Sequence, residues 1–202
     1  MKRAFFLFIA IFFAVFFVVK LPSVYSQEKV IQTDTPVGID VEATQSSEFV
    51  SKTVNYELAY PGILPDNPLY IFKVIRDGIV KILINDPFKK AQFSLLNADK
   101  RMFAAKLLVD NSKDKLAIET ISKSNNYFDD AIKSIKTAKK LNPKSTEIRP
   151  FLHQLKTSIL KHREMTGQLM LSIDKQFSQS LITEEKRMEE IGKNVESLLL
   201  QK

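Results

Sequence analysis

Apolar side chains recur at alternating steps of three and four residues through two long stretches of the chain, a spacing typical of a packed helix face. The first stretch should run from Pro87, capped by Asp86, to about Asp110, with a seam of Phe88, Ala91, Leu95, Ala98, Met102, Ala105 and Val109. The second should begin at Lys113 or Asp114, with a seam of Ala117, Ile121, Ser124, Phe128, Ala131, Ile135 and Ala138. Because the connection is so short, we expect two antiparallel helices.

An earlier helix is predicted for residues 68–84, with a broad apolar face made by Ile71, Val74, Ile75, Gly78, Ile79 and Ile82. Asp66 or Asn67 can cap this helix, and Pro68 suits its first position. Glycine costs about 1 kcal/mol relative to alanine inside a helix. We therefore expect either a close helix crossing or a kink at Gly78.

Two more helices are predicted toward the C-terminus. The fourth should begin near residues 146–148 and continue to about residue 180, on a seam of Ile148, Leu152, Leu155, Ile159, His162, Thr166, Leu169, Ile173, Gln176 and Ser180. Because this seam becomes polar toward its end, we expect its far half to be less buried. Thr183 and the two glutamates after it signal the start of a fifth helix, with a seam of Met188, Ile191, Val195 and Leu198. That helix should dock on the others or form a coiled-coil contact with a second copy.

The predicted fold class is all-α, an elongated antiparallel bundle of four or five helices without strands. Helices two to four should be about 25, 28 and 34 residues long, or ~40–50 Å at the usual rise per residue. Residues 56–141 should form the first helical part, and residues 142–202 the C-terminal helices of the same bundle.

A signal segment and a linker should precede the bundle. A basic start of three residues is followed by sixteen apolar residues, Ala4–Val19, and then by Lys20. This is the pattern of a secretory signal peptide, here residues 1–26. An uncleaved signal-anchor is the alternative, since sixteen residues span ~24 Å as a helix against a hydrocarbon core of ~30 Å. Residues 27–55 are predicted to be a flexible tether, with a short element packed on the bundle as the alternative.

The stretch Tyr60–Tyr70 holds three prolines and one glycine and should form a stiff, extended arm that leads into the first helix. In one interpretation its apolar side chains pack on the bundle and seal its end. In the other the arm is a docking segment for a partner protein. Its candidate interaction residues are Tyr60, Pro61, Gly62, Leu64, Pro65, Asp66, Pro68 and Tyr70.

The net charge of +7 is unevenly distributed. Lys2, Arg3 and Lys20 belong to the N-terminal segment and residues 27–55 carry a net −3, so residues 56–202 carry +7. Without an arginine-rich run or a ladder of aromatic and basic residues, this charge does not predict nucleic-acid binding. We expect a solvated surface with at most weak attraction to anionic surfaces. The chain has no Cys, which excludes disulfides, thiolate metal sites and cysteine nucleophiles.

No residue pattern predicts a catalytic, cofactor or metal site. The two histidines, His153 and His162, are nine residues apart on the fourth helix and point in opposite directions at 3.6 residues per turn. We expect His162 to be a core or edge residue rather than a metal ligand. The neighbouring carboxylates at 129–130, 184–185 and 189–190 diverge by ~100° on a helix and should form a solvated face rather than an acid–base pair.

Three charged residues, Asp99, Lys100 and Arg101, stand together on the predicted second helix. One of them should pair with the arm or with the first helix. We expect a surface position for this group, with a buried structural ion pair as the alternative.

The chain resembles a family of exported bacterial and archaeal proteins through the run Tyr60-Pro-Gly-Ile-Leu-Pro-Asp-Asn-Pro-Leu-Tyr70, followed by Lys73, Arg76-Asp77, Asp86-Pro87, Lys89-Lys90-Ala91 and Ala98-Asp99-Lys100-Arg101. The resemblance covers about residues 56–140, and the family is known only as a domain of unknown function. It implies an N-terminal signal or anchor followed by helices, and it supplies no catalytic residues.

We expect an extracytoplasmic protein, whether periplasmic, cell-surface or secreted, that acts without catalysis as a binding or scaffolding module of the cell envelope. Its partners should be envelope proteins or a second copy, with no cofactor, no nucleic acid, and membrane contact only through an uncleaved N-terminal segment. One alternative is a periplasmic chaperone or stress sensor, since Leu181-Ile-Thr-Glu-Glu185 is faintly similar to a repeat of helical periplasmic chaperones. Another is an envelope hydrolase without a recognisable motif.

Overall fold

The computed structural model describes residues 53–201, so the predicted signal segment and most of the predicted linker lie outside it. The described part consists of α2 (Tyr70–Leu83), α3 (Pro87–Asp110), α4 (Asp114–Leu141), α5 (Ile148–Met170), a short 3-10 helix η1 (Lys175–Phe177) and α6 (Ser178–Leu200). No strand occurs among these residues. The all-α fold class predicted from the apolar spacing is therefore confirmed.

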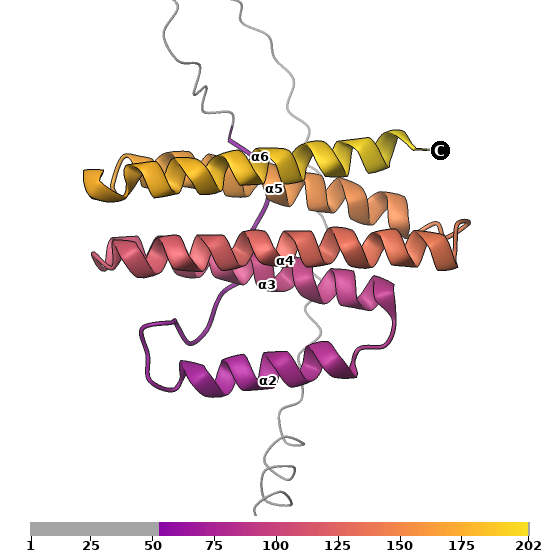
Figure 1. Cartoon of the computed structure of the whole chain (residues 1–202), viewed down its shortest axis with the longest axis horizontal. Coiled ribbons are helices and arrows are strands. Elements are labelled where there is room, and N and C mark those ends of the chain that lie inside the picture. The colour runs from indigo at the N-terminus through magenta and orange to yellow at the C-terminus, as the bar shows by residue number, and fades with distance from the viewer. Residues whose placement is uncertain (1–52, 202) are drawn as a thin grey trace, which may run out of the picture. The chain divides into compact units, whose positions relative to one another are not determined.

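Four of the helices form a closed bundle and one lies outside it. Figure 1 shows α3 with α4 in one layer and α5 with α6 in the next, while α2 runs along the opposite side of the α3–α4 layer. Within the bundle α3 packs on α4 and α5, and α6 packs on α4 and α5. The core lies between these four helices, and its largest fully buried apolar side chains are Phe128, Met102, Leu108, Ile121, Ile135, Leu155, Ile159, Leu181, Met188 and Val195.

The seams predicted for the second and third helices form the centre of this core. All seven seam residues of α4 are buried, and so are six of the seven in α3, with Phe88 half-buried. Asp86 caps α3 as expected, since its Oδ1 accepts a hydrogen bond from Phe88 N (2.8 Å) and Pro87 takes the first helical position. Each large apolar side chain buried here contributes about 1.5–3 kcal/mol.

The boundaries predicted for the last two helices are wrong. The spacing predicts that the fourth helix reaches residue 180, but α5 ends at Met170 and the chain reverses through residues 171–177. Asp174 begins the return, because its Oδ1 accepts a hydrogen bond from Gln176 N (3.1 Å). The polar end of the predicted seam thus falls in the 3-10 helix (Gln176) and in the first turn of α6 (Ser180), and α6 begins at Ser178, before the expected start near Thr183. The predicted α6 seam is buried, so this helix docks on the bundle.

The start of the first helix also differs from the prediction. α2 begins at Tyr70 rather than Pro68, and its N-cap residue, Leu69, has no side-chain cap. Asn67 Oδ1 accepts a hydrogen bond from Leu69 N (2.9 Å) just before the helix. A Cβ atom at Gly78 would have no atom within 4 Å. The close helix crossing expected at Gly78 is therefore absent.

The turn between α3 and α4 places Ser112 in the left-handed region, with φ 57°. The flanking hydrogen bonds, Ser112 N to Val109 O (2.8 Å) and Lys113 N to Leu108 O (2.8 Å), are those of a helix end that glycine usually occupies. Ser112→Gly should raise the free energy of unfolding by about 0.5–1 kcal/mol, because glycine adopts this φ without steric cost. Urea unfolding measures the change. Ser172→Gly, at a turn residue with negative φ, should instead lower the free energy of unfolding. If Ser172→Gly raised the free energy of unfolding and Ser112→Gly did not, this explanation would be contradicted.

Candidate functional site

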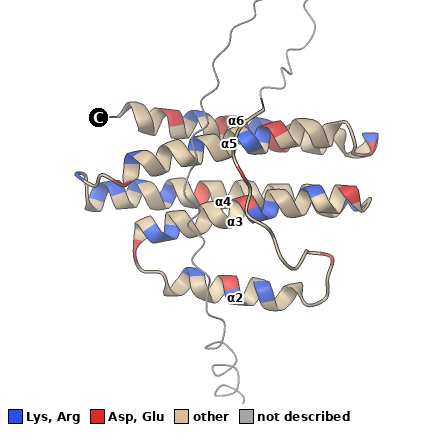
Figure 2. Ribbon diagram, turned by 180° about the vertical axis from the view of Figure 1, so that it is seen from behind, with Lys and Arg blue, Asp and Glu red and all other residues tan. Residues whose placement is uncertain are grey.

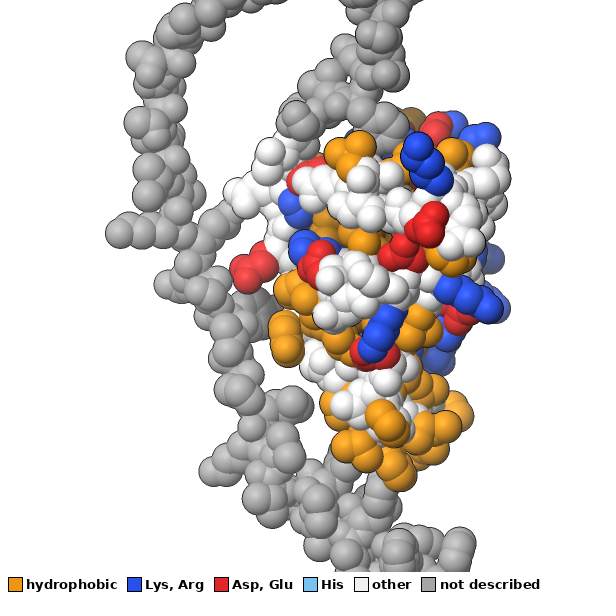
Figure 3. All heavy atoms as spheres, turned by 90° about the vertical axis from the view of Figure 1, so that its left-hand side faces the viewer, with side chains coloured by type: hydrophobic (Ala, Val, Ile, Leu, Met, Phe, Trp, Pro, Cys, Tyr) orange, Lys and Arg blue, Asp and Glu red, His pale blue; other side chains and the backbone are white. Residues whose placement is uncertain are grey.

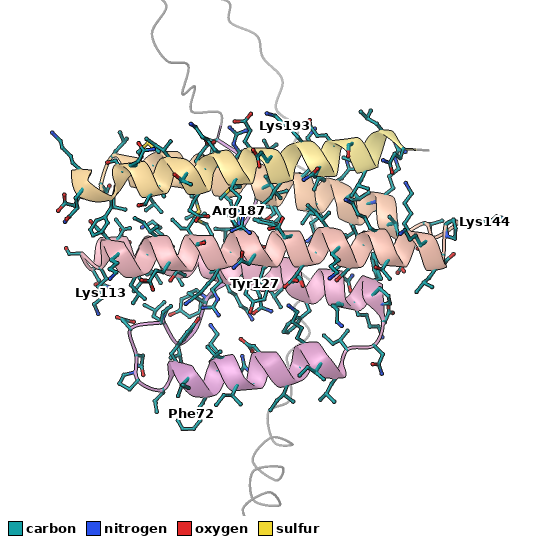
Figure 4. All side chains as sticks on the ribbon, viewed as in Figure 1. Phe72, Lys113, Tyr127, Lys144, Arg187 and Lys193 are labelled. Carbon is teal, nitrogen blue, oxygen red and sulfur yellow. The ribbon has the colours of Figure 1, made fainter. Side chains whose placement is uncertain are left out.

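The apolar face of α2 points away from the bundle. The members of this outward face, together with Leu69 just before the helix, are all exposed: Leu69, Ile71, Phe72, Ile75, Ile79, Ile82 and Leu83. Phe72 is 64% exposed and Ile82 is 78% exposed. The buried residue of α2 is instead Asp77, at 7%. Figure 3 shows hydrophobic side chains gathered at the lower edge of the molecule, over α2, and Figure 4 shows Phe72 on the side of α2 away from α4.

The polar face of α2 attaches the helix to the rest of the protein. Figure 2 marks the charged positions along α2. Lys73 Nζ donates a hydrogen bond to Pro61 O (2.6 Å), and burial lowers the pKa of this ammonium. Lys81 forms an ion pair with Asp130 of α4. The usual arrangement of an amphipathic surface helix, with apolar residues inward and charges outward, is therefore reversed in α2.

A small pocket lies between α2 and the α3–α4 layer. It has a volume of about 270 Å³ and is lined by Tyr70, Val74, Lys81, Arg101, Lys123, Asn126, Tyr127 and Asp130. The Arg101 guanidinium carbon is 5.1 Å from the centre of the Tyr70 ring and 5.9 Å from that of Tyr127. Tyr127 lies on the side of α4 that faces α2 (Figure 4). We call this site the Arg101 pocket.

A larger, open hollow of about 800 Å³ lies where the α3–α4 turn meets the α5–α6 connection. Two of its charged groups, Lys113 and Asp114, are engaged within the protein. Lys113 Nζ is 2.6 Å from Asp66 Oδ2, and Asp114 Oδ2 accepts a hydrogen bond from Asp174 N (2.8 Å). These contacts hold the arm and the α5–α6 connection in place.

A buried polar network joins three helices inside the bundle. The Asp99 carboxylate accepts hydrogen bonds from Tyr56 Oη (2.6 Å), Ser158 Oγ (2.6 Å) and His162 Nε2 (2.9 Å). On the other side of the ring, His162 Nδ1 is 3.3 Å from Ser124 Oγ, which donates to the carbonyl of residue 98 (2.9 Å). The surface position expected for Asp99 and Arg101 is therefore wrong, since both are buried. The partner of Asp99 is His162, because a carboxylate inside the core needs donors around it.

Burial sets the protonation state of this network. It lowers the pKa of His162, and the hydrogen bond to Asp99 opposes that shift only in part. The neutral ring donates from Nε2 to Asp99. Because the single Ser124 hydroxyl proton is donated to the carbonyl of residue 98, the unprotonated Nδ1 lies beside Ser124 Oγ without receiving that proton. Burial, with the Asp99 charge, also raises the pKa of Tyr56 far above its usual value, so this phenol remains a donor.

A serine, a histidine and an aspartate in hydrogen-bonded order resemble the groups of a nucleophilic triad. Ser124 and His162 have no exposed surface, and Asp99 is 4% exposed. A substrate cannot reach Ser124 Oγ in this arrangement. The network acts on the fold instead, by joining α3, α4 and α5 to Tyr56 in the segment that precedes the arm.

The described residues also lack two other kinds of site. No group of three or more potential metal-ligating side chains occurs between residues 53 and 201. Within the same range, every helix is too short or too polar to cross a bilayer. The neighbouring carboxylates point to separate partners, such as Asp130 to Lys81 and Asp129 to Arg187.

Residues 62–197 match the family model described as Domain of unknown function (DUF5667). The chain belongs to this family. Searches of curated proteins and of solved structures give no match. The matched range contains α2 to α5 whole and most of α6, so the DUF5667 domain of this chain includes both the bundle and the outlying α2.

The arm residues, of which Tyr60 and Pro61 precede the matched range, lie in succession along one segment rather than around one pocket. Pro61 is buried; Leu64, Pro65 and Tyr70 are half-buried; Tyr60, Gly62, Asp66 and Pro68 are exposed. The Tyr60 ring, although 71% exposed, meets the Phe103 ring edge-on at 5.9 Å. Gly62 has φ +68°, which glycine adopts readily. Of the arm residues, Tyr70 lines the Arg101 pocket.

The segment before the arm is held against the bundle as well. Val54 N donates a hydrogen bond to Glu164 Oε2 (2.7 Å), and Lys161 Nζ donates to Oε1 of the same carboxylate (2.9 Å). Burial acts to raise the pKa of Glu164, but these hydrogen bonds hold that pKa below its usual value. Tyr56 and Val54 thus tie the chain to α3 and α5 on its way to α2.

Stability should depend on pH through His162. Its pKa is lower in the folded than in the unfolded protein, so below about pH 6.5 the unfolded chain takes up a proton that the folded chain does not. The free energy of unfolding should fall by up to ~1.4 kcal/mol per pH unit as pH drops from about 6.5 toward 5. Urea unfolding across this range measures the slope. His162→Gln should flatten the slope and the exposed His153→Gln should leave it unchanged; equal slopes in all three proteins would contradict this assignment.

Proposed function

We propose that this protein is an extracytoplasmic, non-enzymatic binding module of the cell envelope, and that the outward face of α2 is its binding surface for a lipid membrane. The observation that supports this most is the reversal of α2, whose apolar half is exposed while its charged half is turned to the bundle. Monomeric proteins rarely expose contiguous apolar patches larger than a few hundred Å², and such patches commonly mark interaction sites.

The width of the face favours lipid over a single partner helix. At ~100° per residue, the outward apolar positions of α2 span roughly a third of its circumference. A coiled-coil partner needs only a narrow seam of two positions per heptad. A lipid interface, by contrast, contacts the whole apolar half of a helix that lies in its plane.

Charge supports the same surface. Helices that lie on membranes carry Lys and Arg on their polar face, at the level of the headgroups, while their apolar face sinks about 5–10 Å toward the acyl chains. In α2 the cations Lys73, Arg76 and Lys81 are engaged within the protein, by Pro61 O, Asp77 and Asp130 respectively, so attraction to headgroups falls to the net charge of the domain. The net +7 of residues 56–202 adds attraction to anionic lipids.

The N-terminal sequence brings a membrane within reach when it is retained as an anchor. Residues 21–52 would then connect the apolar run to the described part of the chain. Such a tether raises the effective concentration of the α2 face at the membrane. The membrane contact expected only at the N-terminus is thereby extended to α2.

Vesicle flotation tests the proposal on the chain without residues 1–26, so that the apolar run does not contribute. We expect binding to vesicles that contain anionic phosphatidylglycerol, and weaker binding as salt is raised. Absence of binding to any vesicle, at micromolar protein and millimolar lipid, would refute lipid as the occupant. A concentration-dependent dimer would then indicate a second copy on the α2 face. Suppression of the aggregation of an unfolded client would indicate the chaperone alternative.

A further inference from the structure

We infer that the Arg101 pocket is a binding site for one phosphate group, either free phosphate or a phosphate monoester. This goes beyond the proposed function, because a small soluble phosphate ester would fill the pocket as well as a lipid headgroup would. In no other part of the described chain does a buried cation without a hydrogen-bond partner lie next to a further unpaired cation.

Arg101 is the central cation of the pocket. The residue is 8% exposed, and its Nη1 atom is buried without a hydrogen-bond partner among the described residues. Leaving a buried charged donor unsatisfied is costly. The rings of Tyr70 and Tyr127 contact the guanidinium but supply no acceptor in its plane. The guanidinium thus needs an acceptor that the protein does not provide.

A second polar group in the pocket lacks a partner. Tyr70 Oη is buried and makes no hydrogen bond within the described structure. A phenol O–H can donate to the same anion that the guanidinium binds. Two unsatisfied donors on neighbouring elements, α2 and α3, therefore line one cavity.

Charge determines the kind of ligand. The pocket is lined by three cations, Lys81, Arg101 and Lys123, and one carboxylate, Asp130. Lys81 is paired with Asp130, whereas Arg101 and Lys123 have no ion-pair partner in the described part of the chain. Two positive charges remain, which match the charge of about −1.5 to −2 on a phosphate monoester near neutral pH.

The size of the pocket is consistent with one such group. Its volume of about 270 Å³ is below the ~300–1,000 Å³ of typical small-molecule sites. A phosphate with several waters fits, but a large ligand does not. Because the lining comes from α2, α3 and α4, a bound phosphate would bridge the outlying helix to the bundle.

The test is calorimetric titration of the full chain in a non-ionic maltoside detergent, which carries no phosphate. One arm uses inorganic phosphate and the other uses dihexanoyl phosphatidic acid, whose headgroup is a phosphate monoester. We expect saturable one-to-one binding. The dissociation constant should be about tenfold larger for Lys123→Gln and larger still for Arg101→Gln, since each substitution removes a charge-assisted contact. Lys133→Gln, an exposed substitution on α4 outside the pocket, should leave binding unchanged.

Each outcome decides for or against the pocket. Tighter binding of phosphatidic acid than of phosphate would support the pocket and identify a lipid headgroup as the source. Equal affinity for phosphate and for phosphatidic acid would support the phosphate site and indicate that its ligand is a soluble phosphate compound. No saturable binding of either ligand, or binding that Lys123→Gln leaves unchanged, would overturn it. Since Lys123 is exposed, its substitution should not impair folding, and circular dichroism of each variant checks this point.

Discussion

Replacement of Asp99 by alanine is expected to lower the free energy of unfolding by about 3–5 kcal/mol. The carboxylate accepts hydrogen bonds from Tyr56, Ser158 and His162, and all three donors would lose their acceptor. Each buried donor left unsatisfied costs about 1–3 kcal/mol. Because the donors come from α5 and from the segment before the arm, the loss should affect the whole bundle.

Urea unfolding followed by circular dichroism measures this effect. Asp99→Asn keeps one carbonyl oxygen as an acceptor and should cost less than Asp99→Ala. Tyr56→Phe removes one donor and should cost about 1 kcal/mol. A loss below about 1 kcal/mol for Asp99→Ala would show that the network contributes little to stability and would refute its role in holding the bundle together.

The second large effect concerns the outward face of α2. Ile75→Glu combined with Ile79→Glu should weaken binding to anionic vesicles by at least about tenfold. Burying a fully exposed isoleucine contributes roughly 1.5–3 kcal/mol, so burying the exposed half of these two side chains contributes about 1.5–3 kcal/mol in total, which would be lost. The free energy of unfolding should change little, because both side chains are about half exposed in the protein itself, at 52% and 47%.

Leu160→Glu is the matched control. Leu160 is 42% exposed on α5, outside the α2 face, so this variant changes charge and hydrophobicity without altering the proposed binding surface. Equal loss of vesicle binding in the control and in the α2 variant would mean that net charge, rather than the α2 face, governs binding.

The spacing of apolar residues predicts most of the bundle for a physical reason. On α3 and α4 the seams are long and regular, so the buried face follows from helix geometry alone. The same pattern predicts an apolar face on α2, but it does not predict whether this face is turned to the bundle or away from it. The reversal of α2 depends on the ion pair of Lys81 with Asp130 and on the contact of Lys73 with Pro61 O, which join residues far apart in sequence or across the arm.

The spacing does not predict the polar network, although a signal for it exists. Ser124 and His162 occupy positions within apolar seams, and a polar residue in a seam needs a buried partner. Asp99, next to the seam residue Ala98, is a candidate for that partner. Which residues meet depends on how α3, α4 and α5 pack side by side, and sequence spacing within one helix does not determine this.

The most direct test of the central claim, that α2 binds lipid through its outward face, uses a single tryptophan. The chain has none, so Phe72→Trp places one reporter on the α2 face, and Leu171→Trp places one at a turn residue that is 90% exposed. Each full chain is reconstituted into vesicles whose acyl chains carry bromine, a quencher of short range. We expect blue-shifted, strongly quenched emission at position 72 and solvent-like, unquenched emission at position 171. Unquenched emission at position 72 would contradict the claim.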